Sequence, residues 1–315
     1  MRSLDKVSFD QAKKWIEEVE DYVTQWKLDG ISVEIIYDEG EFWKAISKGG
    51  LDITKPIQLS LSVPQTISEK KRLVSIRGEA VIKKRDFREF FETFSNPRAL
   101  VSGLTHRKGE DDPDWEYIHF IAYQTDKSFD TQISKLQWLK KEGFEIVPYV
   151  LRNFEKTYQI LNKKRNALDI PIDGLVLKAN RVEDQVYCRK HWRFAVKFPP
   201  KKAETIVKDI QWNVGKTGRL NPIVIVEPTK LSGIIIRRIS GHSRSFMRKK
   251  QIQIGSKIVI TRAGDVIPHI EEVIENPGFQ ELTEHPKCER IYIRGAHYFR
   301  KLKSSQLSLK KRRKR

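Results

Sequence analysis

The sequence has only two cysteines among its 315 residues, Cys188 and Cys288. They stand a hundred residues apart, so they supply neither a framework of disulfides nor a paired metal knuckle. This usage is typical of a reducing compartment. We therefore expect a cytoplasmic protein, in the host cytoplasm if the chain is viral.

Long hydrophobic runs are also missing. The longest are short stretches such as Ile223–Val226, and the N-terminal stretch Met1–Lys6 contains no apolar signal core. A membrane-spanning helix needs about 20 apolar residues, so the sequence predicts no association with a membrane. The 39% hydrophobic content nevertheless suffices for a core, and the length suggests two domains.

Acidic residues are in short supply. Lys and Arg number 60 against 41 Asp and Glu, which gives a net charge of +19. Such a balance indicates a polyanionic partner, most often nucleic acid. Residues 300–315 carry nine Lys or Arg and no acid. This tail fits either a segment that binds phosphates without sequence preference or a solvated segment that aids solubility.

The residues up to Pro200 mix helical and strand patterns. Ser8 and Gln11 form a capping box before a predicted helix over residues 9–23. Other predicted helices run through Phe87–Phe94, through Ile133 to a stop at Gly143, and through Phe154–Leu161. Predicted strands cover residues 31–37, 41–46, 74–83, 115–123, 175–180 and 193–198, the first two as a hairpin.

Pro199 and Pro200 mark a predicted domain boundary. From Ala203 the pattern is entirely β, with strands expected over 206–214, 223–227, 234–239 and 257–261. Short strands at this spacing suit a small barrel of the OB type. We therefore predict an α+β protein with domains at 1–200 and 201–275, followed by a remnant and basic tail at 276–315.

The most informative stretch is Lys27-Leu28-Asp29-Gly30. It reads as the Lys-x-Asp-Gly signature of enzymes whose lysine amine attacks the α-phosphate of a nucleotide and holds it as a phosphoramidate. Taken alone, the motif also fits a strand that enters a tight turn at Asp29-Gly30.

Six further motifs follow Lys27 in a fixed order: Ile76–Glu79, Asn96–Arg98, Ile172–Lys178, Ala195–Pro199, Val214–Gly218 and Arg262–Pro268. Together they resemble the NAD-dependent DNA ligases, from about Met1 to Ile274. The resemblance implies an ATP-grasp-like nucleotidyltransferase domain followed by an OB-fold domain. The last two motifs resemble the NAD-using branch rather than ATP-dependent ligases or capping enzymes.

The resemblance implies catalytic roles for four residues. Lys27 would be the nucleophile, which must attack as a neutral amine, and Asp29 would shape the turn that presents it. Lys197 would line the AMP phosphate and place positive charge where the transition state spreads negative charge. Asp173 would associate with Mg²⁺, a hard cation that prefers oxygen ligands.

The resemblance also implies contacts with the cofactor and with DNA. Further cofactor-binding residues would be Gln25 at the base, Lys48, Glu79 near the sugar, Tyr123 stacked on adenine, and Lys178 at the phosphate. Tyr123 fits equally well as a core aromatic. Arg98, Lys216 and Arg262 would bind DNA, because positive charge neutralises phosphates.

The sequence departs from the family pattern at several positions. Gln25 replaces the usual glutamate at the base, and Lys48 replaces an arginine, which loses the bidentate guanidinium. Pro171 replaces an acid often found two residues before Asp173. The four-cysteine zinc module of the family is reduced to Cys288.

These departures leave three hypotheses. In the first, the chain is the core of a split NAD-dependent ligase that seals 3′-OH/5′-phosphate nicks in duplex DNA through a lysyl-AMP intermediate. A second ligase subunit would then supply the nicotinamide-binding part, expected before Met1, or the DNA clamp. The alternatives are a nucleic-acid-binding subunit with a vestigial site and an ATP-dependent DNA or RNA ligase.

Overall fold

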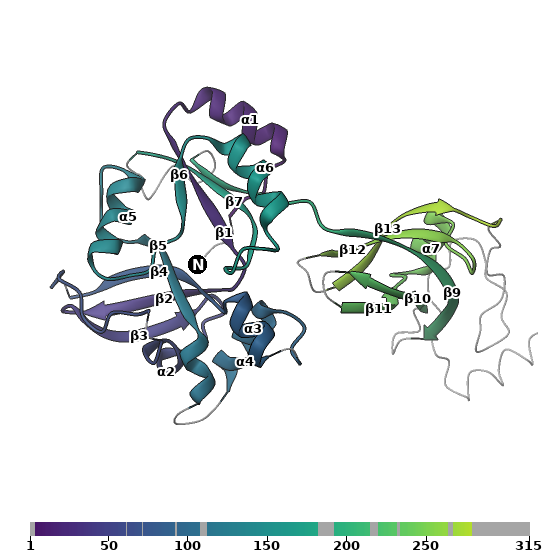
Figure 1. Cartoon of the computed structure of the whole chain (residues 1–315), viewed down its shortest axis with the longest axis horizontal. Helices are drawn as coiled ribbons and strands as arrows, with labels where there is room; N and C mark the ends of the chain where they lie inside the picture. The colour runs from purple at the N-terminus through teal and green to yellow at the C-terminus, as the bar shows by residue number, and fades with distance from the viewer. Residues whose placement is uncertain are drawn as a thin grey trace, which may run out of the picture. The chain divides into compact units, whose positions relative to one another are not determined.

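The computed structural model describes residues 4–278 except 61, 71, 92, 108–111, 182–191, 215–219, 232–233 and 264–266. The chain divides into two compact units, and the second begins at Pro200. Figure 1 shows the helices and strands of each unit. No helix in the described part of the chain is long and apolar enough to cross a membrane.

Two four-stranded antiparallel sheets form the centre of the first unit. The first sheet has the order β6-β1-β7-β8, with bounds Tyr149–Leu151, Tyr22–Leu28, Ile172–Ala179 and Arg193–Lys197. The second has the order β3-β2-β4-β5, with bounds Glu41–Ser47, Ile31–Asp38, Val74–Val81 and His119–Thr125. One apolar core contains residues of both sheets, such as Leu175 and Ile76.

Helices surround these sheets. They are α1 (Phe9–Glu18), α2 (Thr54–Gln58), α3 (Lys84–Phe90), α4 (Pro97–His106), α5 (Gln132–Lys141) and α6 (Phe154–Lys164), with a 3-10 helix η1 at Pro113–Tyr117. Ser8 caps α1 through the predicted capping box. The predicted hairpin is confirmed, and Gly40 at its turn has a φ of +88°.

Three predicted elements of the first unit are wrong at one end. The helix predicted over Phe87–Phe94 is α3, which ends at Phe90. The helix predicted over residues 9–23 ends at Glu18, because the backbone turns extended at Val19 and Tyr22 already belongs to β1. The strand predicted over residues 115–123 begins only at His119. Residues before it form η1, where Asp112 accepts a hydrogen bond from the Asp114 amide.

The second unit has a five-stranded antiparallel sheet of the order β11-β10-β9-β12-β13. Its strands are Ile234–Ser240, Leu220–Leu231, Lys202–Val214, Lys257–Ala263 and Ile267–Glu275. The prediction that this region is all β is wrong, because α7 (Arg244–Lys250) begins after the capping residue Ser243. Closure of the sheet into a barrel stays a prediction.

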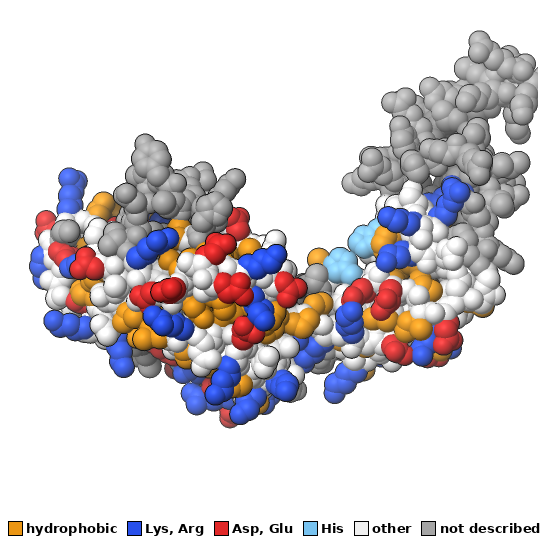
Figure 2. All heavy atoms as spheres, turned by 90° about the horizontal axis from the view of Figure 1, so that it is seen from above, with side chains coloured by type: hydrophobic (Ala, Val, Ile, Leu, Met, Phe, Trp, Pro, Cys, Tyr) orange, Lys and Arg blue, Asp and Glu red, His pale blue; other side chains and the backbone are white. Residues whose placement is uncertain are grey.

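Each unit has its own apolar core, and the two cores share no residue. Figure 2 shows Lys and Arg side chains scattered over this face of both units, with acidic side chains between them. The described Lys and Arg side chains seen in this view are therefore not gathered into one patch on either unit.

Candidate active site

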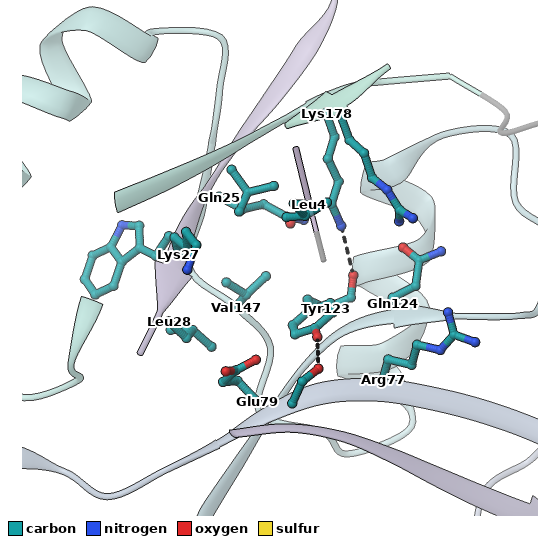
Figure 3. A pocket seen from close by; sticks show the side chains of 14 residues that line it. Leu4, Gln25, Lys27, Leu28, Arg77, Glu79, Tyr123, Gln124, Val147 and Lys178 are labelled. Atoms are coloured by element: carbon teal, nitrogen blue, oxygen red, sulfur yellow. Dashed lines mark hydrogen bonds between the residues drawn. The ribbon is translucent and has the colours of Figure 1, made fainter. Parts of the chain in front are cut away.

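A pocket of the first unit collects most of the residues expected at the nucleotide. Both sheets contribute to it, and Gln25, Lys27, Glu79, Tyr123 and Lys178 all line it (Figure 3). Sequence reasoning missed the remaining lining residues: Leu4, Trp26, Leu28, Ser32, Arg77, Gln124, Val147, Val176 and Arg193.

Strand register brings the two lysines to one carboxylate. Gly174 on β7 pairs with Lys27 on β1 and with Lys197 on β8. The Nζ atom of Lys27 lies 2.7 Å from Asp173 Oδ1, and that of Lys197 lies 2.6 Å from Asp173 Oδ2. Asp173 is only 15% exposed, so water screens its charge little. The attraction between this carboxylate and both ammonium groups is therefore strong.

A second ion pair stands beside the first. The Arg98 guanidinium donates to Asp29 Oδ1 at 2.9 Å. Arg98 lies in the first turn of α4. That turn begins here because Asn96 caps the helix by accepting from the Ala99 amide and because Pro97 suits the first helical position. Burial raises the pKa of Asp29, and the nearby charge of Asp173 raises it further, whereas Arg98 and Lys27 oppose this.

Glu79 on β4 is a carboxyl that titrates near neutral pH. Burial raises the pKa of Glu79 to about 7, although the cations Lys27 and Arg98 lower it, and the anions Asp29 and Asp173 raise it again. The effect of all four residues on Glu79 shows that the two ion pairs and this carboxyl form one electrostatic system.

Tyr123 and Lys178 form another wall of the pocket. Lys178 Nζ donates to the Tyr123 carbonyl at 3.3 Å and lies 5.7 Å from the centre of the tyrosine ring. The Tyr123 hydroxyl shares a 2.9 Å hydrogen bond with Ser32 Oγ (Figure 3). Burial raises the pKa of Tyr123, so the hydroxyl stays neutral. The ring packs on the core and also lines the pocket, whereas its stacking on adenine stays a prediction.

Gln25 lies two residues before Lys27 on β1. Its side chain is 2% exposed, and its Nε2 atom has no hydrogen-bond partner among the described residues. A buried donor of this kind carries an energetic cost that a bound ligand can remove.

Two expected contact residues lie outside the pocket, and a third is not among the described residues. Lys48 is exposed after β3, where its backbone amide donates to the Ser32 carbonyl, and it does not line the pocket. Arg262 on β12 is only 2% exposed, so its side chain offers little surface to a phosphate. Lys216 lies outside the described residues. The roles assigned to these three residues stay predictions.

The donor set around Asp173 suits a hard cation. Carboxylate oxygens are the protein ligands that Mg²⁺ prefers, and phosphate and water oxygens commonly complete its shell. Among the described residues, no group of three or more His, Cys, Asp or Glu side chains forms a metal cage. A cation here would therefore depend on the ligand for much of its coordination.

Comparisons with known proteins agree with this geometry. A family model of the NAD-dependent DNA ligase adenylation domain matches residues 1–201, and one of the NAD-dependent DNA ligase OB-fold domain matches residues 204–280. The DNA ligase of Brachyspira hyodysenteriae is 34% identical over 80% of this chain and 42% of its own length. The DNA ligase of Clostridioides difficile is 31% identical over 93% of this chain and 48% of its own length.

A solved structure of a Lig E DNA ligase superposes with a TM-score of 0.51 at 16% identity, covering 87% of this chain and 99% of that one. This last likeness concerns the fold alone. The chain spans less than half the length of the two curated relatives named above. Its family models together account for most of its residues, and the chain belongs to the NAD-dependent DNA ligase family, with an adenylation domain followed by an OB-fold domain.

Proposed function

We propose that this chain takes AMP from NAD⁺ onto Lys27 and uses it to seal nicks in duplex DNA. The observation that supports the proposal most directly is the convergence of Lys27 and Lys197 on Asp173, beside a pocket that Tyr123 and Gln25 also line. A reactive amine next to cationic and hydrogen-bonding groups is the arrangement that nucleotidyl transfer needs.

In the first step, the Lys27 amine attacks the α-phosphorus of NAD⁺. A phosphorus–nitrogen bond forms, the phosphorus–oxygen bond to nicotinamide mononucleotide breaks, and that group leaves with the oxygen and its electron pair. The lysine ammonium loses one proton to become the attacking amine and a second when the new bond forms, and both pass to solvent water. Lys197, which pairs with Asp173, and Lys178, which lines the pocket, would offset the negative charge that spreads over the phosphoryl oxygens in the transition state.

In the later steps, Lys27 passes AMP to the 5′-phosphate at a nick, which breaks the phosphorus–nitrogen bond and forms a pyrophosphate. The 3′-hydroxyl then attacks the 5′-phosphorus, a phosphodiester forms and AMP leaves. Arg98, which forms an ion pair with Asp29, is the cation of this site that we propose to bind DNA phosphates.

Asp173 is the residue we propose to hold Mg²⁺, which would supply charge neutralisation at the phosphates. In the free chain, one of its oxygens accepts from Lys27. A Lys27 amine joined to phosphorus no longer carries an ammonium charge, so adenylylation would free Asp173 Oδ1. The carboxylate can thus pair with the Lys27 ammonium before adenylylation and bind a cation after it.

The finer parts of the proposal concern partners. Nicked duplex DNA is the expected substrate, and a second ligase subunit remains a prediction. The vestigial-site alternative draws on Gln25, Lys48 and Pro171. The retention of Lys27, Asp173 and Lys197 as one cluster argues against it. The ATP-dependent alternative makes the same lysine adduct from a different donor.

A labelling experiment separates these possibilities. The purified chain would be incubated with Mg²⁺ and NAD⁺ labelled in its adenylate, in parallel with labelled ATP, and Lys27→Ala would be the control. We expect covalent label from NAD⁺ that the substitution abolishes. Label from ATP alone would favour the ATP-dependent alternative.

Absence of label from both donors would lead to a second assay with a nick that already carries AMP. Sealing of that nick by the chain would support a sound core whose nicotinamide-binding part lies on a partner. Failure of both assays, also in the presence of candidate partner subunits, would favour the vestigial site.

A further inference from the structure

Lys197 stands at the very end of a strand that lies at the edge of its sheet. It is the last residue of β8, and β8 pairs with β7 on its inner side. The Phe198 amide makes the last of these inner contacts, because it donates to the Asp173 carbonyl at 3.0 Å. Strand ends at a sheet edge open most easily, so the contacts on the outer side of β8 help to decide where Lys197 lies.

Contacts at every second residue secure that outer side. A backbone amide ahead of α1 donates to the Ala195 carbonyl at 3.1 Å. The Tyr158 hydroxyl, from α6, donates to the Lys197 carbonyl at 3.0 Å. Arg165 then donates to the Pro199 carbonyl at 3.0 Å. Backbone groups of an extended chain alternate in direction, so Tyr158 contacts the carbonyl that a neighbouring strand would otherwise bond at Lys197.

The Tyr158 side chain has a fixed place of its own, because its ring belongs to an aromatic cluster. The centre of the ring lies 4.8 Å from that of Phe9, 5.8 Å from that of Phe154 and 5.1 Å from that of Phe198. Burial raises the pKa of the Tyr158 hydroxyl, although Arg165 lowers it. The hydroxyl therefore keeps the proton that it donates to the Lys197 carbonyl.

The side chain of Lys197 depends on this backbone position. Its Nζ lies 2.6 Å from Asp173 Oδ2, yet the side chain is 36% exposed, so packing restrains it only in part. A displacement of the strand end would carry the ammonium group away from the carboxylate. Misplacement of a reacting or charge-stabilising group by about 1 Å can lower a rate about 100-fold.

We propose that Tyr158 is a positioning residue of the active site, whose hydroxyl fixes the end of β8 so that Lys197 meets the phosphoryl group during AMP transfer. This inference rests on the proposed function, since it concerns the same reaction. Tyr158 is not one of the residues that line the pocket. It would therefore act through Lys197 and not on the nucleotide itself.

The test removes the hydroxyl and leaves the ring. Tyr158→Phe keeps the aromatic cluster, and Tyr37→Phe is the matched control. The Tyr37 hydroxyl also donates to a backbone carbonyl, that of Pro64 at 2.5 Å, and Tyr37 is fully buried in the same unit. The control thus loses a bond of the same kind at a site that does not line the pocket.

Two activities of the full chain would be followed in single turnovers with Mg²⁺. Labelling from NAD⁺ at a series of concentrations gives a maximal rate and a half-saturating concentration. Sealing of a nick that already carries AMP gives a second rate at the same phosphate. Both would be repeated in a chain that carries Lys197→Ala, with and without Tyr158→Phe.

We expect Tyr158→Phe to lower the maximal labelling rate about 10- to 100-fold and to change the half-saturating concentration less than about threefold. Lys197 acts on charge that develops in the transition state, so its misplacement slows transfer more than it weakens binding. Sealing should slow by a similar factor, and Tyr37→Phe should keep both rates within about twofold. In the Lys197→Ala chain, Tyr158→Phe should lower the rates less than about twofold, because the residue through which it acts is gone.

Other results would overturn the inference and leave the proposed function standing. These are unchanged rates in Tyr158→Phe, an equal loss in Tyr37→Phe, or an equal loss with and without the Lys197 side chain. An unaltered chain that neither takes label from NAD⁺ nor seals the prepared nick would instead refute the proposed function, and the inference with it.

Discussion

Gly174 has no room for a side chain, and this constraint shapes the site. A Cβ atom there would lie 2.3 Å from the Val196 carbonyl oxygen, and one at Gly30 would lie 2.1 Å from the Ala80 carbonyl oxygen. Both glycines belong to motifs that we singled out in the sequence because of the lysine and aspartate residues they contain. Gly174 lets β7 and β8 approach closely enough for Asp173 and Lys197 to meet, and Gly30 lets the chain entering β2 lie against β4.

We predict that Gly174→Ala destabilises the chain by roughly 1 to 3 kcal/mol, because β7 and β8 must move apart to admit the methyl group. Chemical denaturation would measure the change in the free energy of unfolding. Gly49→Ala is the matched control, since the nearest atom to its Cβ would be 3.9 Å away. Equal stability of the two variants would refute the close-packing role.

Glu79 gives a prediction about pH. Its pKa is about 7 in the folded chain against 4.5 for the ordinary side chain, so the folded state binds the proton more tightly. Stability should therefore fall as pH rises from about 4.5 to 7 and then level off. Glu79→Gln removes this titration. Between pH 4.5 and 7 the free energy of unfolding of the variant should therefore rise by about 1 to 3 kcal/mol relative to that of the unaltered chain.

Denaturation curves of both proteins between pH 4 and 8 would measure this difference. Because the other titrating groups occur in both proteins, subtraction isolates Glu79. A difference in unfolding free energy that stays constant over the window would contradict the raised pKa.

At the site, the sequence predicted residue identities better than their contacts. Motif order pointed to Lys27, Glu79, Asp173 and Lys178, and all but Asp173 line the pocket while Asp173 bonds to Lys27. The contact between Lys27 and Asp173 spans 146 residues of sequence, so only the strand register determines it. Ser32 and Gln124 gave no signal, because single polar residues on alternating strands are common.

At the scale of elements, the capped helix α4 links local sequence to the site. Asn96 accepts from the Ala99 amide at 2.8 Å, and two residues later Arg98 pairs with Asp29. We predict that Asn96→Ala costs about 1 kcal/mol of stability, whereas Asn96→Asp, which keeps the capping oxygen, costs much less. Urea denaturation of both variants would measure this, and equal losses would show that the cap is dispensable.

The errors in element bounds have physical causes. Trp15, Val19 and Tyr22 keep helical spacing past the end of α1, but Tyr22 is buried as the first residue of β1, so tertiary packing decided its conformation. Helix α7 was missed because its basic residues leave Met247 as its single buried side chain. The capping side chain of Ser243 was the available signal.

At the scale of the whole molecule, the pocket belongs to the first unit. Every residue that lines the pocket lies between Leu4 and Arg193, and the core of the first unit contains no residue from beyond Phe198. The OB-fold unit has an independent core of residues such as Val224 and Ile260. Nucleotide binding should therefore not require the second unit.

We predict that a fragment of residues 1–200 folds and binds AMP within about threefold of the affinity of the full chain, because it keeps the whole pocket and the core beneath it. Calorimetric titration of both proteins would measure the affinities, and a single cooperative unfolding transition would establish that the fragment is folded. If the OB-fold unit binds DNA phosphates as proposed, the fragment should bind nicked duplex DNA much more weakly than the full chain. A folded fragment that loses AMP binding by more than about tenfold would show instead that the second unit helps to form the nucleotide site.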